Sequence, residues 1–265
     1  MSGMEYDVLV VGGGVAGLSA GTFTARHGLE TLVCDAGGSL LRRNAHLENV
    51  PGFPAGVNSR QFLALLGEQA ENAGAERRET RVTTVQPTTE DGPEGDGGSD
   101  GDDGSDGPDR RRFRIETIDG DRLGADYVVA ATKNATGYLE EVDGVDLLDR
   151  GKTFVDADER GRTGVDGLYA AGRLARKPHQ AAVAAGHGAE VGVTILEDDD
   201  RPFYHDWVAP EGYFSDRDRP IPPGCEEIGE AERREREAAS LEAMRDRFAE
   251  SHPDDQETHP SLREE

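Results

Sequence analysis

The stretch from Asp7 to Asp35, DVLVVGGGVAGLSAGTFTARHGLETLVCD, constrains the fold more than any other part of the chain. A short apolar run ends at three consecutive glycines, and residues with helical spacing follow as far as Gly28. A second apolar run, residues 31–34, then ends in Asp35. This order predicts a strand, a glycine turn, a helix and a second strand.

The glycine turn carries a phosphate-binding spacing. Gly12, Gly14 and Gly17 form GxGxxG, in which the first glycine allows a tight turn, the second lets backbone approach a pyrophosphate, and the third lets helix and strand pack closely. Phosphates would lie at the free N–H groups of the helix N-terminus. Asp35 follows Gly12 by 23 residues, where a carboxylate accepts hydrogen bonds from a ribose diol. The sequence therefore predicts a dinucleotide site rather than a glycine turn without a ligand.

The charge of the chain restricts its partners. The 265 residues carry 54 acidic and 29 basic side chains, a net charge of −25 that disfavours nucleic acid and anionic membranes. Because only three of the basic residues are lysines, we interpret the acid excess as a halophilic adaptation to high salt. No apolar run approaches the ~20 residues of a membrane span, and no signal peptide is recognisable, so we expect a cytoplasmic protein. Cys34 and Cys225 fit no CxxC or metal-site spacing, and we expect no metal site.

Further elements follow from periodicity. Residues 36–56 predict an ordered loop, and Asn58 and Ser59 offer an N-cap to a helix over about 60–73. The apolar face expected for this helix consists of Phe62, Leu65, Leu66, Gln69 and Ala73. We expect strands at 80–85, 113–118, 127–132, 153–156 and 167–172, and a helix over 180–196 with Pro178 in its first turn. Its three glycines, Gly186, Gly188 and Gly192, predict close approach to the sheet and burial nearly all round.

Three segments differ from this α/β pattern. Residues 87–112 contain no aliphatic or aromatic side chain, which predicts a disordered acidic insertion, and they lack the DxDxDG spacing of a calcium loop. Residues 203–214 hold five of the fifteen aromatic residues, so we expect them to dock. Residues 226–250 predict a charged helix, either a surface helix or a dimer contact. We therefore divide the chain into a domain, 1–199, and a C-terminal extension, 200–265.

Together these motifs make the chain resemble the flavin domain of the thioredoxin reductase-like, pyridine nucleotide-disulfide oxidoreductase family. The resemblance covers about residues 6–197 and is carried by GGGVAGLSA with Asp35, GGSL followed by ENVPGF, VVAAT, TGVDGLYAAGR and HQAAVAAGHGAEVG. It implies an α/β fold, a Rossmann-like FAD/NAD(P)-binding three-layer domain with a parallel central sheet and a small β-meander. It also implies FAD as the cofactor.

Roles for individual residues come from the same resemblance. It places Val82 near the adenine, Asn49 beside the isoalloxazine and Gln180, with its helix N-terminus, at the flavin O2 edge. The whole cofactor-binding set implied is Gly12, Gly14, Val15, Ala16, Gly17, Asp35, Ala36, Asn49, Val82, Ala131, Thr132, Gly172, Arg173, Gln180 and Ala181.

The chain also departs from that family. Relatives insert an NADPH domain with a redox CxxC between the halves of the flavin domain, and both are missing here. Arg173 stands where relatives have an aspartate that holds a ribityl hydroxyl, and Lys133 stands where they have glycine. Arginine can pair with the pyrophosphate but cannot accept that hydrogen bond.

Two functional hypotheses remain open. One is an FAD-dependent oxidoreductase that accepts electrons from NAD(P)H or a partner protein and passes them to an unidentified acceptor, with a homodimer as an option. Arg42, Arg43, His46 and Lys133 are candidates for binding an anionic donor, and 203–214 for a lid. The other is a non-catalytic flavin-binding sensor or assembly module. A thiazole synthase-like enzyme would need a cysteine and metal ligands that we do not find, and no catalytic residue is assigned.

Overall fold

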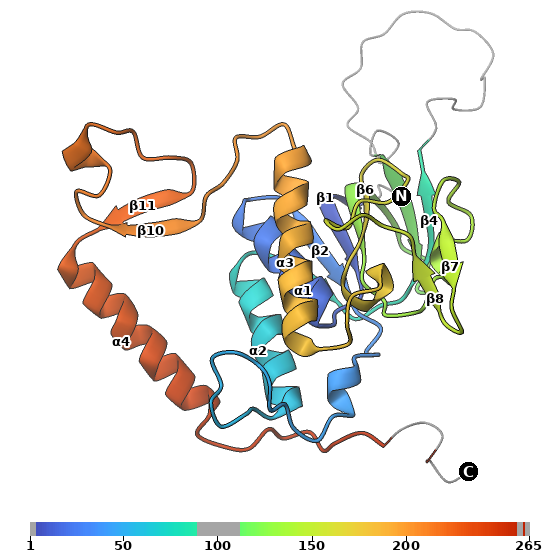
Figure 1. Cartoon of the computed structure of the whole chain (residues 1–265), viewed down its shortest axis with the longest axis horizontal. Helices are drawn as coiled ribbons and strands as arrows, with labels where there is room; N and C mark the ends of the chain where they lie inside the picture. The colour runs from blue at the N-terminus through green and yellow to red at the C-terminus, as the bar shows by residue number, and fades with distance from the viewer. Residues whose placement is uncertain (1–3, 89–111, 259–261, 263–265) are drawn as a thin grey trace, which may run out of the picture.

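The computed structural model describes residues 4–88, 112–258 and 262 (Figure 1). Its central layer is a sheet in which five parallel strands lie side by side. Their spatial order is β3 (Glu76–Arg78), β2 (Thr31–Cys34), β1 (Met4–Val11), β6 (Arg122–Ala130) and β9 (Leu168–Ala170). The chain moves outward from β1 to β3 and then returns to the other side of β1. Ligands bind at the carboxyl ends of strands where the order reverses in this way.

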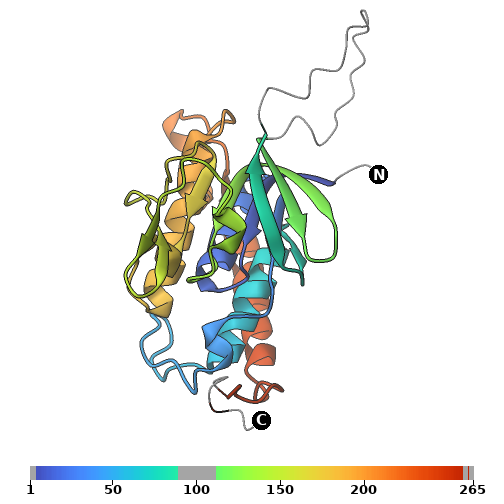
Figure 2. The same ribbon diagram turned by 90° about the vertical axis from the view of Figure 1, so that its right-hand side faces the viewer.

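Strand β6 joins the parallel sheet to an antiparallel meander. Along one edge it pairs first with β5 (Phe113–Thr117), antiparallel, and then with β9, parallel. Strand β4 (Val82–Pro87) pairs with β5 on the outside. A second small antiparallel pair, β7 (Leu147–Asp149) and β8 (Thr153–Val155), lies beside β4 in Figure 1, and Figure 2 views the molecule from that side. The predicted α/β class, with a parallel sheet and a β-meander, is confirmed.

Alternate residues of β1 face two separate cores, as expected for a strand buried on both sides. Val8 and Val10 pack in the cluster that contains residues of α1 (Val15–Arg26) and α3 (Ala181–Asp198). Leu9 and Val11 pack in the cluster formed with the meander. Helices, sheet and meander therefore make three layers.

Helices α1 and α3 are in close contact because glycines remove the side chains between them. A Cβ on Gly188 would lie 2.1 Å from the backbone oxygen of Ala16, and one on Gly192 would lie 2.7 Å from the Cβ of Phe23. The predicted close approach to the sheet is thus wrong, since these glycines face α1. Burial all round is also wrong, because Gly186 and Glu190 are exposed.

Several predicted boundaries shift. Pro178 lies before α3, and Gln180 is the N-cap residue. Helix α2 (Ser59–Asn72) begins as expected, since the Asn58 side chain accepts from the N–H groups of Arg60 and Gln61. Its inner face is Phe62, Leu63, Leu66 and Ala70, whereas Gln69 is exposed. Strand β6 begins before the apolar run, and β3 and β7 were not predicted. Most of the predicted insertion, residues 89–111, lies outside the described residues.

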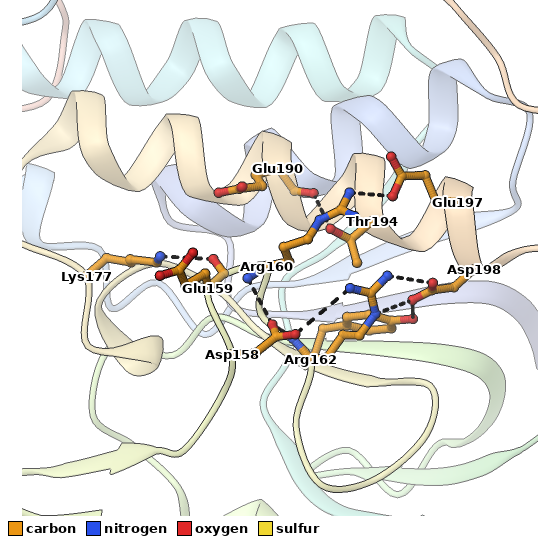
Figure 3. Close-up of polar contacts among 10 residues, drawn as sticks. Asp158, Glu159, Arg160, Arg162, Lys177, Glu190, Thr194, Glu197 and Asp198 are labelled. Atoms are coloured by element: carbon orange, nitrogen blue, oxygen red, sulfur yellow. Dashed lines mark hydrogen bonds and ion pairs between the residues drawn. The ribbon is translucent and has the colours of Figure 1, made fainter.

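An ion-pair network fixes the segment before β9 to α3 (Figure 3). The Arg162 guanidinium pairs with the Asp198 carboxylate at 2.6 Å, and the Tyr169 hydroxyl donates to the same carboxylate at 2.8 Å. Arg160 pairs with Glu197 one residue earlier on the helix. These contacts fix residues 160–162 and β9 against α3, and with them the turn that follows β9.

The C-terminal extension contacts the domain through exposed ion pairs, hydrogen bonds and aromatic contacts such as Phe248 on Phe53. Strands β10 (Trp207–Pro210) and β11 (Cys225–Ile228) pair with each other, and Asp206 pairs with Arg26 at the end of α1. Helix α4 (Glu230–Arg247) has no buried residue and stands away from the sheet layers in Figure 1. Its far end pairs Arg247 with Glu68 of α2.

Candidate functional site

A cavity of about 1090 Å³ opens at the carboxyl ends of β1, β2 and β6, where the strand order reverses. Thirteen of the fifteen residues in the predicted cofactor-binding set line it, although they come from seven separate parts of the chain. These are Gly12, Gly14, Val15, Ala16, Asp35, Ala36, Asn49, Val82, Ala131, Thr132, Arg173, Gln180 and Ala181.

The glycine turn forms the floor of this cavity. Gly12 has φ of +115°, and a Cβ there would lie 2.7 Å from the backbone oxygen of Ala131. Gly14 is the N-cap of α1, carries no side-chain cap, and faces open space, with no atom within 4 Å of where its Cβ would be. The first N–H groups of α1 thus remain accessible from the cavity, which fits a bound phosphate.

Gly17 and Gly172 are the two predicted residues that do not line the cavity, because they pack behind it. A Cβ on Gly17 would lie 1.9 Å from the oxygen of Gly12. A Cβ on Gly172 would lie 2.7 Å from the Cβ of Ala16, and its φ is +64°. The Gly172 N–H donates to Nδ1 of His187 at 2.9 Å. Neither glycine faces the cavity, and each one fixes the backbone shape of a turn that does.

His187 is a buried residue of α3 that the sequence analysis did not single out. Burial is the main cause that lowers the pKa of its imidazole, and Lys177 lowers it further. Because Nδ1 accepts the Gly172 N–H, the proton of the neutral ring lies on Nε2. His187 thus positions the turn that carries Arg173.

Asp35 lines the cavity directly after β2. Its carboxylate accepts the N–H of Gly37 at 2.9 Å and lies against Gly13, where a Cβ would be 2.5 Å away. Among the described residues no donor binds the second carboxylate oxygen, Oδ2, which leaves an acceptor for a diol.

Asn49 and Gln180 meet although 131 positions separate them in sequence. The Asn49 side-chain amide donates to the Gln180 side-chain oxygen at 2.7 Å. Gln180 is the N-cap of α3 but makes no cap hydrogen bond with its side chain. The pair therefore places two amides and a helix N-terminus at one wall of the cavity.

A second wall carries basic side chains. Lys133, Arg173 and His179 line the cavity, as does His46, whose ring bonds to the Glu48 carboxylate at 2.8 Å. Burial is the largest cause lowering the pKa of Lys133, followed by repulsion from Arg43, Arg173 and Lys152. Burial is also the largest cause lowering the pKa of His179, followed by Arg173, Lys133 and Lys152.

Other residues lie in the cavity without a sequence signal that could have found them. Tyr138 lies in a single 3-10 turn, residues 137–139, and its buried hydroxyl pairs with the Thr132 hydroxyl at 3.0 Å. Arg81 and Thr83, near the start of β4, also line the cavity. A short turn in a polar segment has no periodicity, so only the fold reveals these contacts.

Several candidates from the sequence do not meet at the cavity. Arg42 faces Glu257 of the C-terminal tail, 4.0 Å away. Asp206 binds Arg26, at the end of α1 opposite to Gly14, so residues 203–214 lie about 18 Å of helix away from the turn and do not cover the cavity. Cys34 lines the cavity but is buried, and burial raises the pKa of its thiol to about 12.

Metal-binding clusters and membrane-spanning helices are both absent from the part of the chain that the structure describes. No group of three or more His, Cys, Asp or Glu side chains there could hold a metal ion. No helix in residues 4–88 and 112–258 is long and apolar enough to cross a membrane.

Comparison with known proteins places the site in a family context. Residues 7–45 match the model of an FAD binding domain. The chain is 40% identical over 74 residues to a thioredoxin reductase from Aquifex aeolicus and 37% identical over 84 residues to one from Treponema pallidum. These matches cover 27% and 31% of this chain and 23% and 27% of the reductases. The chain thus matches about a quarter of the length of these relatives.

A different enzyme class also shares part of the sequence. The chain is 34% identical over 99 residues to a thiamine thiazole synthase from Sulfolobus acidocaldarius, which covers 28% of this chain and 37% of that protein. This similarity is consistent with a shared nucleotide-binding segment, and the described residues hold no metal cluster of the kind considered above.

Solved structures show the fold. A thioredoxin reductase from Gloeobacter violaceus superposes with a TM-score of 0.61 at 16% identity, covering 77% of this chain and 99% of that one. The reductase of T. acidophilum gives 0.59 at 18% identity, covering 73% and 98%. The chain therefore has a thioredoxin reductase-like fold.

Proposed function

We propose that the protein is an FAD-dependent oxidoreductase related to the thioredoxin reductases. The observation that carries the proposal is the single cavity in which the accessible N-terminus of α1, the Asp35 carboxylate and the Asn49–Gln180 pair come together. The FAD binding domain match over residues 7–45 supports it.

FAD, when bound, supplies the electron-transfer chemistry, and the chain supplies binding, orientation and electrostatics. The turn at Gly12 and Gly14 would hold the pyrophosphate, with Gly17 and Gly172 shaping the backbone from behind. Asp35 would accept hydrogen bonds from the adenosine ribose, and Val82 would lie at the adenine. Asn49, Gln180 and Ala181 would lie at the flavin ring, where the N-terminus of α3 favours negative charge.

The donor and acceptor belong to the same proposal. NAD(P)H or a partner protein would deliver electrons, and a small molecule or a protein would accept them. A dithiol relay does not fit, because Cys34 is buried with a pKa of about 12 and Cys225 lies in β11 of the extension. We further propose that residues 1–199 form the FAD-binding domain, that residues 200–265 form the extension, and that the protein acts in the cytoplasm.

The first experiment is an absorbance spectrum of protein purified in molar KCl, followed anaerobically after NADH or NADPH is added. We expect a yellow protein whose flavin band is bleached. Bleaching by dithionite alone would favour a protein donor or a non-catalytic flavin module. A colourless protein that does not bind added FAD would contradict the proposal.

We also propose that α4 pairs with α4 of a second copy. Leu241 and Met244 share one face of the helix and are 51% and 43% exposed, whereas Phe248, after the helix, contacts Phe53 of the domain. Helix α4 carries six acidic and five basic side chains, near neutrality, in a chain of net charge −25. Two copies of an acidic surface repel each other, so a surface that contacts its own copy is favoured when its net charge is near zero.

Sedimentation in molar KCl tests this dimer. The double variant Leu241→Ser, Met244→Ser is expected to sediment as a monomer when the original chain sediments as a dimer. Ala239→Ser, on the opposite face of α4, is the matched control and should leave the mass unchanged. A monomer before any substitution would contradict the dimer and leave the flavin proposal intact.

A further inference from the structure

Basic side chains gather at one wall of the cavity in a chain that is strongly acidic overall. Lys133 and Arg173 line the wall, and Lys152 and Arg43 lie close enough to repel the Lys133 ammonium. Two of the three lysines of the whole chain are thus found at one place. Of the described residues that line the cavity, only Asp35 and Glu48 are acidic, and Glu48 is bonded to His46.

Lys133 keeps an unfavourable backbone conformation. Its φ is +67°, in the left-handed region that glycine adopts without cost and other residues adopt at about 1 kcal/mol or more. A lysine at such a position, half-buried and facing the cavity, indicates a use for its ammonium group.

Arg173 is held in place without being neutralised. Its Nε donates to the side-chain oxygen of Asn134 at 3.1 Å, and the Asn134 amide donates to the backbone oxygen of Thr153 at 2.8 Å. Within residues 4–88 and 112–258, no carboxylate lies within 4.0 Å of Arg173, Lys133 or Lys152. The terminal nitrogens of Arg173 therefore remain available to an oxyanion.

We propose that Lys133 and Arg173 bind the phosphate or carboxylate group of a small anionic ligand beside the FAD site. This inference rests on the proposed function, because the ligand would be the electron donor or acceptor. The ligand is distinct from FAD because the cofactor's phosphates already have the glycine turn and the N-terminus of α1. His179 lines the same cavity and is exposed, so this part of the cavity is open to a second molecule.

The test uses FAD-loaded protein at constant ionic strength in KCl, titrated with inorganic phosphate and, separately, with acetate. Binding is followed as a change in the flavin absorbance band. We expect Arg173→Gln and Lys133→Gly each to weaken phosphate binding about tenfold, the loss of one charge-assisted contact. Lys133→Gly also relieves the positive φ, so its loss of binding cannot be assigned to misfolding. A stronger response to acetate would identify a carboxylate ligand.

Lys177→Gln is the matched control, since Lys177 is the third lysine and donates to the backbone oxygen of Glu159 at 3.0 Å, outside the cavity (Figure 3). It should leave phosphate binding unchanged. The proposal is overturned if phosphate has no effect on the original protein, or if the cavity variants weaken FAD binding and not phosphate binding. If the protein does not bind FAD, the proposed function fails, and calorimetric titration of FAD-free protein with phosphate still tests the anion site.

Discussion

The domain, residues 4–88 and 112–199, and the extension, residues 200–258, are held in place by different forces. In the domain, β1 and β6 are buried on both faces and α1 contacts α3 through glycines. In the extension, α4 has no buried residue, and nine of the twelve exposed large hydrophobic side chains among the described residues lie beyond residue 200. Close packing fixes a backbone to within a fraction of an ångström, whereas exposed ion pairs fix it weakly. A ligand site requires a backbone fixed by close packing. Substitutions in the domain should therefore have larger effects than substitutions in the extension.

The largest effect is expected at Gly17. A Cβ at this position would lie 1.9 Å from the backbone oxygen of Gly12, so Gly17→Ala forces the turn and the helix apart. We expect the free energy of unfolding to fall by about 3 kcal/mol, measured by denaturant titration in molar KCl.

Gly14→Ala is the matched control for Gly17→Ala. A Cβ at position 14 would meet open space, and the backbone φ is −86°. The free energy of unfolding should therefore change by less than about 1 kcal/mol. The new methyl group projects into the cavity and should weaken FAD binding instead. If both variants lost equal stability, packing would not be what distinguishes the two glycines.

The next effect is expected at Asp35. Asp35→Asn keeps an oxygen that can accept the Gly37 N–H but removes the charge that the proposed ribose contact requires. We expect FAD to bind about tenfold more weakly, with stability nearly unchanged, measured by fluorescence titration. Unchanged FAD affinity would mean that the ribose does not lie at Asp35.

Burial of His187 makes the free energy of unfolding depend on pH. Its pKa is lowered by burial, so below the ordinary value near 6.5 the unfolded chain binds a proton that the folded chain excludes. Stability should therefore be full above pH 6.5 and decrease as the pH falls below it. Denaturant titrations at pH 7.5 and 5.5 should show a smaller difference for His187→Gln. An equal difference in both proteins would assign the pH dependence to other groups.

The contrast between the two regions also explains what the sequence could predict. Gly12, Gly14, Gly17 and Asp35 each have a local requirement, a tight turn or a strand-end carboxylate, so spacing alone located them. The approach of α1 to α3 depends on which glycines oppose which neighbours, and the sequence analysis assigned Gly188 and Gly192 to the wrong surface.

Contacts between distant segments were harder to predict. Asn49 and Gln180 were expected at the cofactor from the family resemblance, but no local pattern indicates that their amides bond to each other. The position of residues 203–214 depends on Arg26 and Asp206, two exposed charges among many. Because nearly any arginine can satisfy such a contact, the predicted lid was placed at the wrong end of α1.

The smallest effect is expected at the Glu68–Arg247 pair, which attaches the end of α4 to α2. Hydrogen bonding to Arg247 lowers the pKa of Glu68, but both side chains are exposed and salt screens them. Glu68→Gln should therefore leave the unfolding midpoint of the domain unchanged while hydrogen exchange in α4 becomes faster. The increase should be larger in dilute KCl than in molar KCl, where the pair is already weakened. If the substitution shifted the domain's midpoint, the extension would be part of the packed unit, and the division near residue 200 would have to be abandoned.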